Sequence, residues 1–382
     1  MNPPLRRLAA TTAGALAAAL AISSATPAAA QDIDVSSLGE GSTTTALEVI
    51  GSLPVGSTAG LIGSVGSADF PLDAGSTNAV GTPRPVDPSI TSSEFLGVIE
   101  QVGAYEYWLV TSRAMSREVV VEVVKSRVEG AAPVLYLLDG VDSPEQHSGW
   151  RSMAKVADRM AGENVHVVAP TGAYAANWTD WEAEDPKLGY NKWETFLTEE
   201  LPEIVETQLE TSGKNAIGGV SMGGQAAMHL AATHEMYDAV MAFSGYYSTM
   251  DPLGYQTLRL TIETRGGDAS NMWGPHGSDR WQENDTISHV DGLDGKRIYF
   301  SAGNGVIGAD DLGVYGDDVQ SMAVGLVLER GVLEGSKAFG QTLQREGIDH
   351  RADYSDSGLH NWVNFMKNFD TGWEYIKPAL QD

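Results

Sequence analysis

Residues 215–232 contain the pattern that most restricts how this chain can fold. A short apolar run at 215–217 leads into Gly-Gly-Val-Ser-Met-Gly-Gly, and a helix-like stretch follows at 225–232. Gly219, Ser221 and Gly223 therefore form a G-x-S-x-G motif between a predicted strand and a predicted helix. Such a turn is sharp, and a side chain at either glycine would collide with neighbouring backbone. The pattern predicts that Ser221 is a nucleophile, with the helix N-terminus favouring the negative charge that develops beside it.

Strand-like and helix-like segments alternate on both sides of this motif. The predicted strands cover 95–99, 105–110, 118–124, 134–138, 165–170, 215–217, 239–243, 297–301 and 350–354. The predicted helices cover 152–160, 193–210, 225–232, 317–329 and 361–376. This alternation predicts an α/β protein with a mostly parallel central sheet and helices on both faces. Together with the serine turn it indicates the α/β-hydrolase fold, in which we expect 251–295 to form a cap excursion over the site.

The first 92 residues have the composition of a targeting segment and a spacer. Arg6 and Arg7, an apolar run at 8–22 and an Ala-Ala-Ala stretch ending at Ala30 predict a signal peptide over 1–30. Residues 31–92 are rich in Gly, Ser and Thr, which predicts a flexible leader. Residues 93–382 are then one hydrolase domain. We expect a protein that is secreted or held in the cell envelope, with no transmembrane segment after cleavage.

The charge and the residue composition exclude several classes of function. The chain has 51 Asp and Glu against 24 Lys and Arg, which argues against nucleic acid as a partner. It has no cysteine, so disulfides and thiol chemistry are impossible. No H-x-x-x-H or H-E-x-x-H pattern occurs, so we expect no catalytic metal, and nothing in the sequence calls for a cofactor.

A serine nucleophile needs a histidine base and an acid that orients it. In this fold the three residues follow in the order Ser, acid, His along the chain. Of the eight histidines, His360 alone follows the last predicted strand in a loop, so we predict it as the base. Position alone places the acid just after the strand at 297–301, which favours Asp310 or Asp311. Glu329, at the end of a predicted helix, is the third possibility.

The oxyanion of an acyl-transfer intermediate requires two backbone N–H donors. One is the amide of Met222, directly after the nucleophile. The second should come from the loop after the buried strand at 134–138, where the Asp139-Gly140-Val141 sequence makes the Val141 amide the candidate.

Several separated blocks in this sequence resemble the antigen 85 family of mycolyltransferases. They are Tyr-Leu-Leu-Asp-Gly at 136–140, Gly-Trp at 149–150, Lys-Trp-Glu-Thr-Phe-Leu-Thr at 192–198, Gly-Val-Ser-Met at 219–222, Met-Trp-Gly-Pro at 272–275, Asn-Asp at 284–285 and Gly-Asn-Gly at 303–305. The resemblance extends from about 95 to 376. It implies an exported α/β-hydrolase that moves a mycoloyl group from trehalose monomycolate to trehalose monomycolate or to wall arabinogalactan.

The resemblance also implies roles for individual residues. The family's acid lies about ten residues before a phenylalanine, which here is Phe339, so the acid becomes Glu329 in place of Asp310 or Asp311. Asp139 matches a residue that contacts the sugar, and Trp362 matches one near the site. The family carries an arginine where this chain has Asp142, a change that affects the expected sugar site more than acyl transfer.

Two other functions compete with the transferase. A secreted carboxylesterase of the esterase D kind would use the same triad and differ only in accepting water in place of a trehalose mycolate, arabinogalactan or another hydroxylated acceptor. A non-catalytic wall-binding protein would keep the fold without the chemistry, which the presence of Ser221, Glu329 and His360 argues against.

Overall fold

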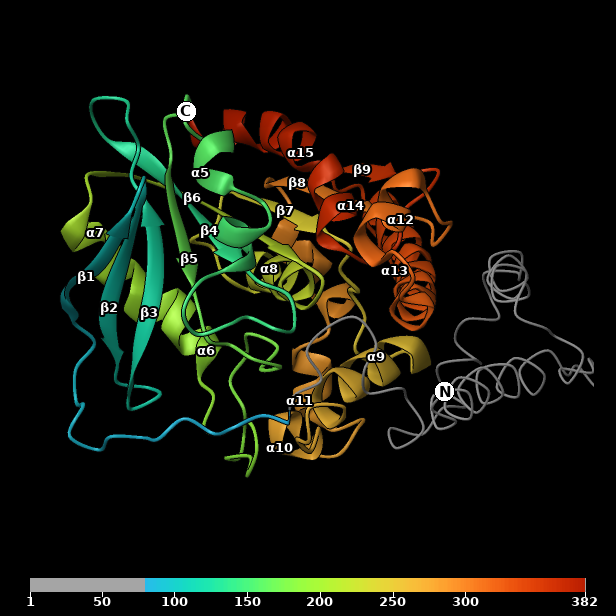
Figure 1. The fold of residues 1–382 in the computed structure, drawn as a ribbon, viewed down its shortest axis with the longest axis horizontal. Coiled ribbons are helices and arrows are strands. Elements are labelled where there is room, and N and C mark those ends of the chain that lie inside the picture. Colours follow the sequence, from blue (N-terminus) through green and yellow to red (C-terminus); the bar gives the residue numbers. More distant parts are fainter. Residues whose placement is uncertain (1–79, 382) are drawn as a thin grey trace, which may run out of the picture.

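The computed structural model describes residues 80–381 and is built around one nine-stranded sheet (Figure 1). The strands are β1 (Phe95–Val102), β2 (Tyr105–Ser112), β3 (Arg117–Val124), β4 (Ala132–Leu138), β5 (His166–Pro170), β6 (Thr211–Val220), β7 (Ala239–Phe243), β8 (Arg297–Ala302) and β9 (Arg351–Tyr354). Their order across the sheet is β1-β2-β3-β5-β4-β6-β7-β8-β9. Strands β1 to β3 pair antiparallel and β3 pairs antiparallel with β5, whereas β5, β4, β6, β7, β8 and β9 run parallel. The predicted α/β-hydrolase class with a mostly parallel sheet is confirmed.

The helices lie between and beyond these strands. They are α4 (Gly149–Ser152), α5 (Val156–Arg159), α6 (Trp193–Thr195), the π-helix η3 (Phe196–Glu200), α7 (Leu201–Gln208), α8 (Met222–Thr233), α9 (Pro252–Glu263), α10 (Ser270–Trp273), α11 (Asp279–Glu283), the 3₁₀-helix η4 (Thr286–Leu293), α12 (Ala309–Tyr315), α13 (Val319–Glu346), α14 (Trp362–Lys367), α15 (Phe369–Ile376) and the 3₁₀-helix η5 (Lys377–Leu380). None of them is long and apolar enough to cross a membrane.

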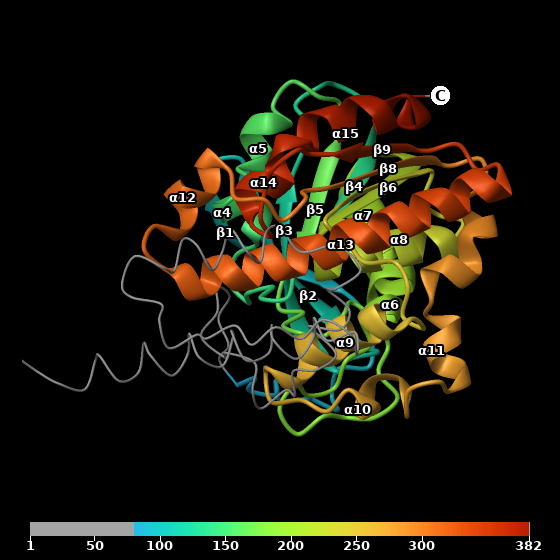
Figure 2. The same cartoon turned by 90° about the vertical axis from the view of Figure 1, so that its right-hand side faces the viewer.

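Helices cover both faces of the sheet because the side chains that point to each face are apolar. On β4, Tyr136 and Leu138 pack into one core with residues of α7, α8 and α13. Leu135 and Leu137 pack into a second core with residues of α5 and α15. Figure 2 shows the result, with α15 above strands β8 and β9 and α13 below them. The central strands β4, β5 and β7 are thus buried on both sides, whereas the edge strand β1 is largely exposed. In the central part of the sheet, the strand ends are the places where a site can form.

Four helical predictions need correction. The predicted helix at 361–376 is two helices, α14 and α15, with Asn368 between them. The predicted helix at 193–210 contains a π-helical turn, in which the Leu201 N–H donates to Phe196 O, because Pro202 has no N–H with which to continue the α-helical ladder. The predicted helix at 152–160 is two short helices, α4 and α5, separated by Lys155, whose φ is +51°. The predicted helix at 317–329 continues to Glu346 as the 28-residue α13.

The excursion between β7 and β8 adds helices and no strand, as expected for residues outside the sheet. Helix α9 is its first part and begins at an Asp251 cap that accepts hydrogen bonds from the N–H groups of Leu253 and Gly254. An apolar cluster that includes Leu258, Ile262, Met272 and Trp281 holds the excursion together. Helix α9 is thereby a fixed wall beside the carboxyl ends of the parallel strands.

The N-terminal predictions fall mostly outside the described residues. The predicted signal peptide at 1–30 and the leader up to residue 79 belong to the part of the chain that the structure does not describe. The described remainder, 80–92, contacts the domain: Gly81 N–H donates to Arg265 O at 2.9 Å, and Arg84 pairs with Glu145 at 2.7 Å. The contacts of the hydrolase domain therefore extend further toward the N-terminus than the expected boundary at residue 93.

Candidate active site

Ser221 lies on a strained turn between β6 and α8. Its φ is +54°, a region that a non-glycine residue adopts only when the surroundings enforce it. A Cβ on Gly219 would meet the carbonyl of Gly223, and one on Gly223 would meet the carbonyl of Leu138. The Ser221 N–H donates to Phe243 O at 2.8 Å, which fixes the turn against β7. The two glycines of the motif are therefore required by close backbone contacts, as the sequence indicated.

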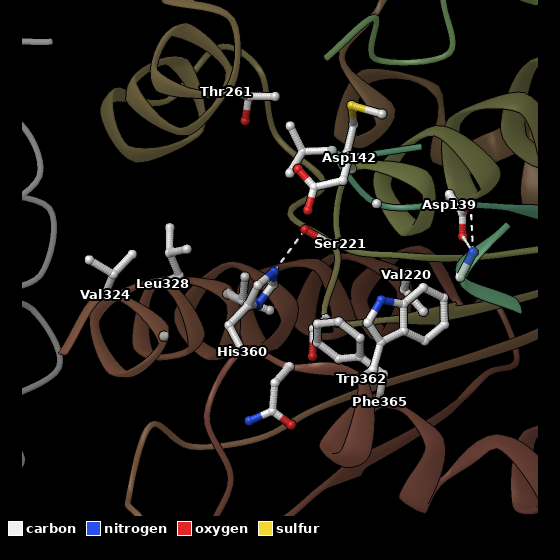
Figure 3. A pocket seen from close by; sticks show the side chains of 18 of the residues that line it. Asp139, Asp142, Val220, Ser221, Thr261, Val324, Leu328, His360, Trp362 and Phe365 are labelled. Carbon is white, nitrogen blue, oxygen red and sulfur yellow. Dashed lines mark hydrogen bonds between the residues drawn. The ribbon is translucent and has the colours of Figure 1, made fainter. Parts of the chain in front are cut away.

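The Ser221 hydroxyl is the first member of a chain of hydrogen bonds. Its Oγ lies 2.7 Å from His360 Nε2, and His360 Nδ1 lies 2.7 Å from Glu329 Oε2. These residues come from the end of β6, the loop after β9 and the middle of α13. Figure 3 shows the bond between Ser221 and His360 at the floor of a cavity. In such an arrangement the imidazole can take the serine proton while the carboxylate holds the ring in the required tautomer.

Glu329 is fully buried and its second oxygen has two donors. Oε1 accepts hydrogen bonds from the Ser244 hydroxyl and the Gly303 N–H, both at 2.6 Å. Ser244 follows β7 and Gly303 follows β8, so both donors come from the carboxyl edge of the sheet. These donors satisfy and fix a carboxylate that would be costly to bury without them. Sequence reasoning missed Ser244, although a polar residue directly after a buried strand is the signal that could have found it.

The two aspartates ranked first on position alone lie elsewhere. Asp310 pairs with Lys367 at 3.0 Å on the surface. Asp311 is fully buried and accepts hydrogen bonds from the side-chain amides of Asn361 and Asn364, at 2.8 and 2.7 Å. Asp311 thus anchors the loop that carries His360 and does not contact the imidazole. Of these three candidates, Glu329 is the one whose carboxylate lies within hydrogen-bond distance of the His360 ring.

The backbone loop after β4 carries the other predicted residues. Val141 and Met222 both line the cavity at Ser221, where we expect their amides to face the reacting oxygen. Two hydrogen bonds from residues 175–178 hold the loop. The Ala175 N–H donates to Val141 O and the Trp178 indole N–H donates to Asp139 O, each at 2.9 Å. This bracing holds the loop in one position, which a preorganised donor site requires.

Asp139 and Trp362 lie together on one side of Ser221 (Figure 3). The Asp139 carboxylate is 2% exposed, and both of its oxygens lie 3.0 Å from the Gly149 N–H. Trp362 packs edge-on against Trp150, with ring centroids 5.3 Å apart. Burial, and to a lesser degree the charges of Glu122 and Asp142, raise the pKa of Asp139 to about 7, against the opposing hydrogen bond from Gly149. Near neutral pH this carboxyl group can both donate and accept hydrogen bonds.

We expect the Asp139→Asn variant to have a different pH dependence of stability. The folded-state pKa of Asp139 is raised from 3.8 to about 7. Its contribution to the free energy of unfolding is therefore favourable below pH 4 and is lost as the pH rises toward 7. A shift of this size corresponds to roughly 4 kcal/mol at most. In urea unfolding at several pH values, the free energy of unfolding of the variant relative to the wild type should increase by up to that amount between about pH 4 and pH 8. A difference that stays constant over this range would contradict the assignment.

The cavity has a volume of about 480 Å³, within the roughly 300–1,000 Å³ that is usual for ligand sites. On the side of Ser221 opposite Asp139 it runs between α9 and α13, where Figure 3 shows Thr261, Val324 and Leu328. Leu260, Val327 and Val332 are further apolar residues of α9 and α13 that line the cavity. The site thus has a polar end with an indole and an apolar end between two helices. Within residues 80–381, no group of His, Asp and Glu is arranged to hold a metal ion.

Comparisons with known proteins agree with this fold. The family described as putative esterase matches residues 112–375. Ag85A of Mycobacterium leprae, named a diacylglycerol acyltransferase/mycolyltransferase, is 31% identical over 287 residues, which are 72% of this chain and 80% of that protein. Ag85B of Mycobacterium avium, with the same activity in its name, is 30% identical over 295 residues, 72% of this chain and 82% of that protein.

Two solved structures share the fold. MPT51 of Mycobacterium tuberculosis has a TM-score of 0.61 and 24% identity, over 73% of this chain and all of that one. An S-formylglutathione hydrolase of Agrobacterium tumefaciens has a TM-score of 0.56 and 16% identity, over 75% and 99% of the two chains. The relatives together support an enzyme of the acyltransferase or esterase type. The chain belongs to the putative esterase family, as a relative of the antigen 85 acyltransferases.

Proposed function

We propose that this protein is an exported serine acyltransferase of the cell envelope that moves a mycoloyl group from trehalose monomycolate to a hydroxylated acceptor. The acceptor is a second trehalose monomycolate or cell-wall arabinogalactan. The observation that carries the proposal is the hydrogen-bond chain from Ser221 through His360 to the buried Glu329. The names of the antigen 85 relatives, which include mycolyltransferase, support the mycoloyl group, and the donor and the acceptors are those that the family resemblance implies.

The proposed reaction has two half-reactions. In the first, Ser221 Oγ attacks the ester carbonyl carbon while His360 Nε2 takes the hydroxyl proton, and the Met222 and Val141 amides donate to the oxyanion. The bond between the carbonyl carbon and the sugar oxygen then breaks, and His360 returns the proton to that oxygen. In the second, His360 Nε2 takes the proton of an acceptor hydroxyl, whose oxygen attacks the carbonyl carbon of the acyl-enzyme. The bond from that carbon to Ser221 Oγ then breaks, and His360 returns the proton to Oγ.

The two ends of the cavity suit the two parts of the substrate. The apolar lobe between α9 and α13 suits an acyl chain, because burying each methylene group there is favourable by roughly 0.8 kcal/mol. At the other end, Asp139 can hydrogen-bond sugar hydroxyls and Trp362 offers an indole face to a pyranose ring. Bound in this way, an acceptor hydroxyl is held near the acyl-enzyme, and this proximity offsets the higher concentration of water.

Hydrolysis is the competing function, because the matching family is described as putative esterase. Asp142 also brings a carboxylate into the cavity at the position where the antigen 85 family carries an arginine. An esterase of this kind would use the same three residues and would discharge the acyl-enzyme to water. The geometry of the triad does not separate the two reactions, so the acceptor decides between them.

Partitioning of the acyl-enzyme tests the transferase directly. With trehalose monomycolate as donor, rising trehalose or trehalose monomycolate should increase the ratio of transferred product to free acid, as measured by mass spectrometry of the products. Asp139→Ala and Trp362→Leu should lower this ratio more than they lower acylation of Ser221, since both side chains lie at the sugar end. Ser152→Ala, a cavity-lining change without a carboxylate or an indole, serves as the control. Free acid as the sole product at every acceptor concentration would make the protein an esterase.

A further inference from the structure

A second, smaller cavity lies where the segment at 81–84 contacts the domain. Its volume is about 30 Å³, which is enough for one or two water molecules or for a monatomic ion. Its lining comes from that segment, the start of β3, the loop after β4 and the loops at 172–174 and 187–191. No residue of the proposed triad lines it, so its chemistry is separate from that of Ser221.

Three cations and one carboxylate line this second cavity. The cations are Arg84, Arg117 and Lys187, and the carboxylate is Glu145. Glu145 already has a partner, because its Oε1 accepts a hydrogen bond from Arg84 Nε at 2.7 Å. The lining thus has an excess of positive charge, in a chain whose 51 Asp and Glu outnumber its 24 Lys and Arg.

Arg117, the first residue of β3, is the least satisfied of these cations. It is 6% exposed. Its Nη2 donates to the Met115 sulfur at 3.2 Å, and its guanidinium carbon lies 5.2 Å from the centre of the Trp193 ring. Its buried Nε has no hydrogen-bond partner within residues 80–381. A thioether is a weak acceptor and an indole face binds a cation without accepting its Nε proton, so this buried charge lacks a strong acceptor.

The charges around Arg117 favour an anion beside it. Burial, followed by the positive charge of Arg84, lowers the pKa of Arg117 to about 10, against the opposing attraction of Glu145. Arg117 is therefore charged at neutral pH and is repelled by a second guanidinium at the same cavity. A negative ion between them offsets both the repulsion and part of the cost of burying Arg117.

We propose that this second cavity binds a small inorganic anion of the size of chloride, held by Arg117, Arg84 and Lys187. The small volume favours a halide over the larger sulfate or phosphate. The anion would join the segment at 81–84 to β3 and to the loop after β4, which also accepts a hydrogen bond from Gly172 N–H through Pro144 O at 3.1 Å. This binding site does not depend on the proposed acyl transfer.

Thermal unfolding in sodium chloride and in sodium gluconate, at equal ionic strength, tests this inference. Any salt screens the repulsion within an acidic chain, so the comparison must hold ionic strength constant. Gluconate is too large for the cavity. The Tm of the wild type should be higher in about 0.2 M chloride than in gluconate by about 2 °C or more, because an ion that binds only the folded state stabilises it.

The NMR line of chloride measures binding directly, because exchange with a site on the protein broadens it. The wild type should broaden this line, and bromide should reverse the broadening by competing for the same cavity. Phosphate at the same concentration should have little effect. Reversal by phosphate at least as strong as that by bromide would contradict a halide-sized site.

Three variants connect these effects to the second cavity. Arg117→Met removes the charge and keeps an unbranched chain beside Trp193, so the chloride-specific Tm shift and the broadening should both be lost. Arg84→Gln, at a side chain that is 24% exposed, should weaken chloride binding by about tenfold. It keeps the test decisive if Arg117→Met does not fold.

Arg159→Gln is the matched control, because Arg159 pairs with Asp370 at 2.8 Å and does not line the cavity. It should keep the chloride response of the wild type. A wild type without a chloride-specific shift or broadening overturns the inference and makes the cavity a water site. Equal chloride responses in the wild type and in Arg84→Gln overturn it as well.

Discussion

Replacing Ser221 by alanine is expected to lower kcat by about 10⁴-fold or more, because no other group in the site can form the acyl-enzyme. The cavity and its oxyanion donors remain, so a small residual rate above the uncatalysed reaction should persist. The measurement is turnover of a soluble ester together with circular dichroism. Alanine cannot form the hydrogen bond to His360, but its Cβ fits where the serine Cβ lies, so the fold should be kept.

A serine-reactive phosphonate separates this prediction from a loss of substrate binding. It should label wild-type protein once, on the peptide that contains Ser221, and it should not label Ser221→Ala. Ser244 lies in the same site and carries a hydroxyl, but that hydroxyl donates to Glu329 at 2.6 Å. Ser244→Ala should therefore still be labelled. Labelling that persists in Ser221→Ala would show that another residue is the nucleophile.

The second large effect is expected for Glu329→Gln, with kcat lowered by roughly 10³- to 10⁴-fold. A glutamine has nearly the same shape, and its carbonyl oxygen can still accept hydrogen bonds from Ser244 and Gly303. Its NH₂ group cannot accept the Nδ1 proton of His360, so the imidazole is driven toward the wrong tautomer and loses the charge that stabilises its protonated form. Turnover measured alongside thermal unfolding separates this effect from instability.

The two aspartates that position alone favours as the acid, Asp310 and Asp311, provide the controls for Glu329. Asp310→Asn removes a surface ion pair with Lys367, and we expect kcat to change by less than about twofold. Asp311→Asn weakens the buried contacts with Asn361 and Asn364, so its main effect should be on thermal stability and on the ordering of the His360 loop. A larger loss of kcat in Asp310→Asn than in Glu329→Gln would contradict the proposed triad.

The sheet could be predicted from the sequence because its strands are encoded locally. The runs at 134–138, 165–170 and 239–243 are short and apolar except for His166, and each lies on a strand of the structure. The lengths and types of the helices were harder to predict from the sequence. The length of α13 depends on packing beyond Glu329, and the π-helical turn before Pro202 depends on one missing N–H group; neither changes the hydrophobic period of its segment.

Some residues of the candidate site could be predicted from the sequence and others could not, for a physical reason. Ser221 and His360 follow from the motif and from chain order, but Glu329, the proposed acid, lies in the middle of α13, where the residue pattern resembles an ordinary helix. Position alone favoured Asp310 or Asp311, and only the family resemblance indicated Glu329. Ser244 follows a buried strand, but its role depends on the fold bringing the end of that strand to Glu329, which the sequence alone does not indicate.

We propose that Ser221 carries an acyl group and passes it to a hydroxylated acceptor. Intact-protein and peptide mass spectrometry after mixing with a trehalose monomycolate donor, before and after trehalose is added, tests this step. We expect a single acyl adduct on the peptide containing Ser221, with loss of the adduct accelerated by trehalose and an equal amount of acylated trehalose formed. An adduct on another residue, or one that is lost only to free acid at a rate independent of trehalose, would contradict it.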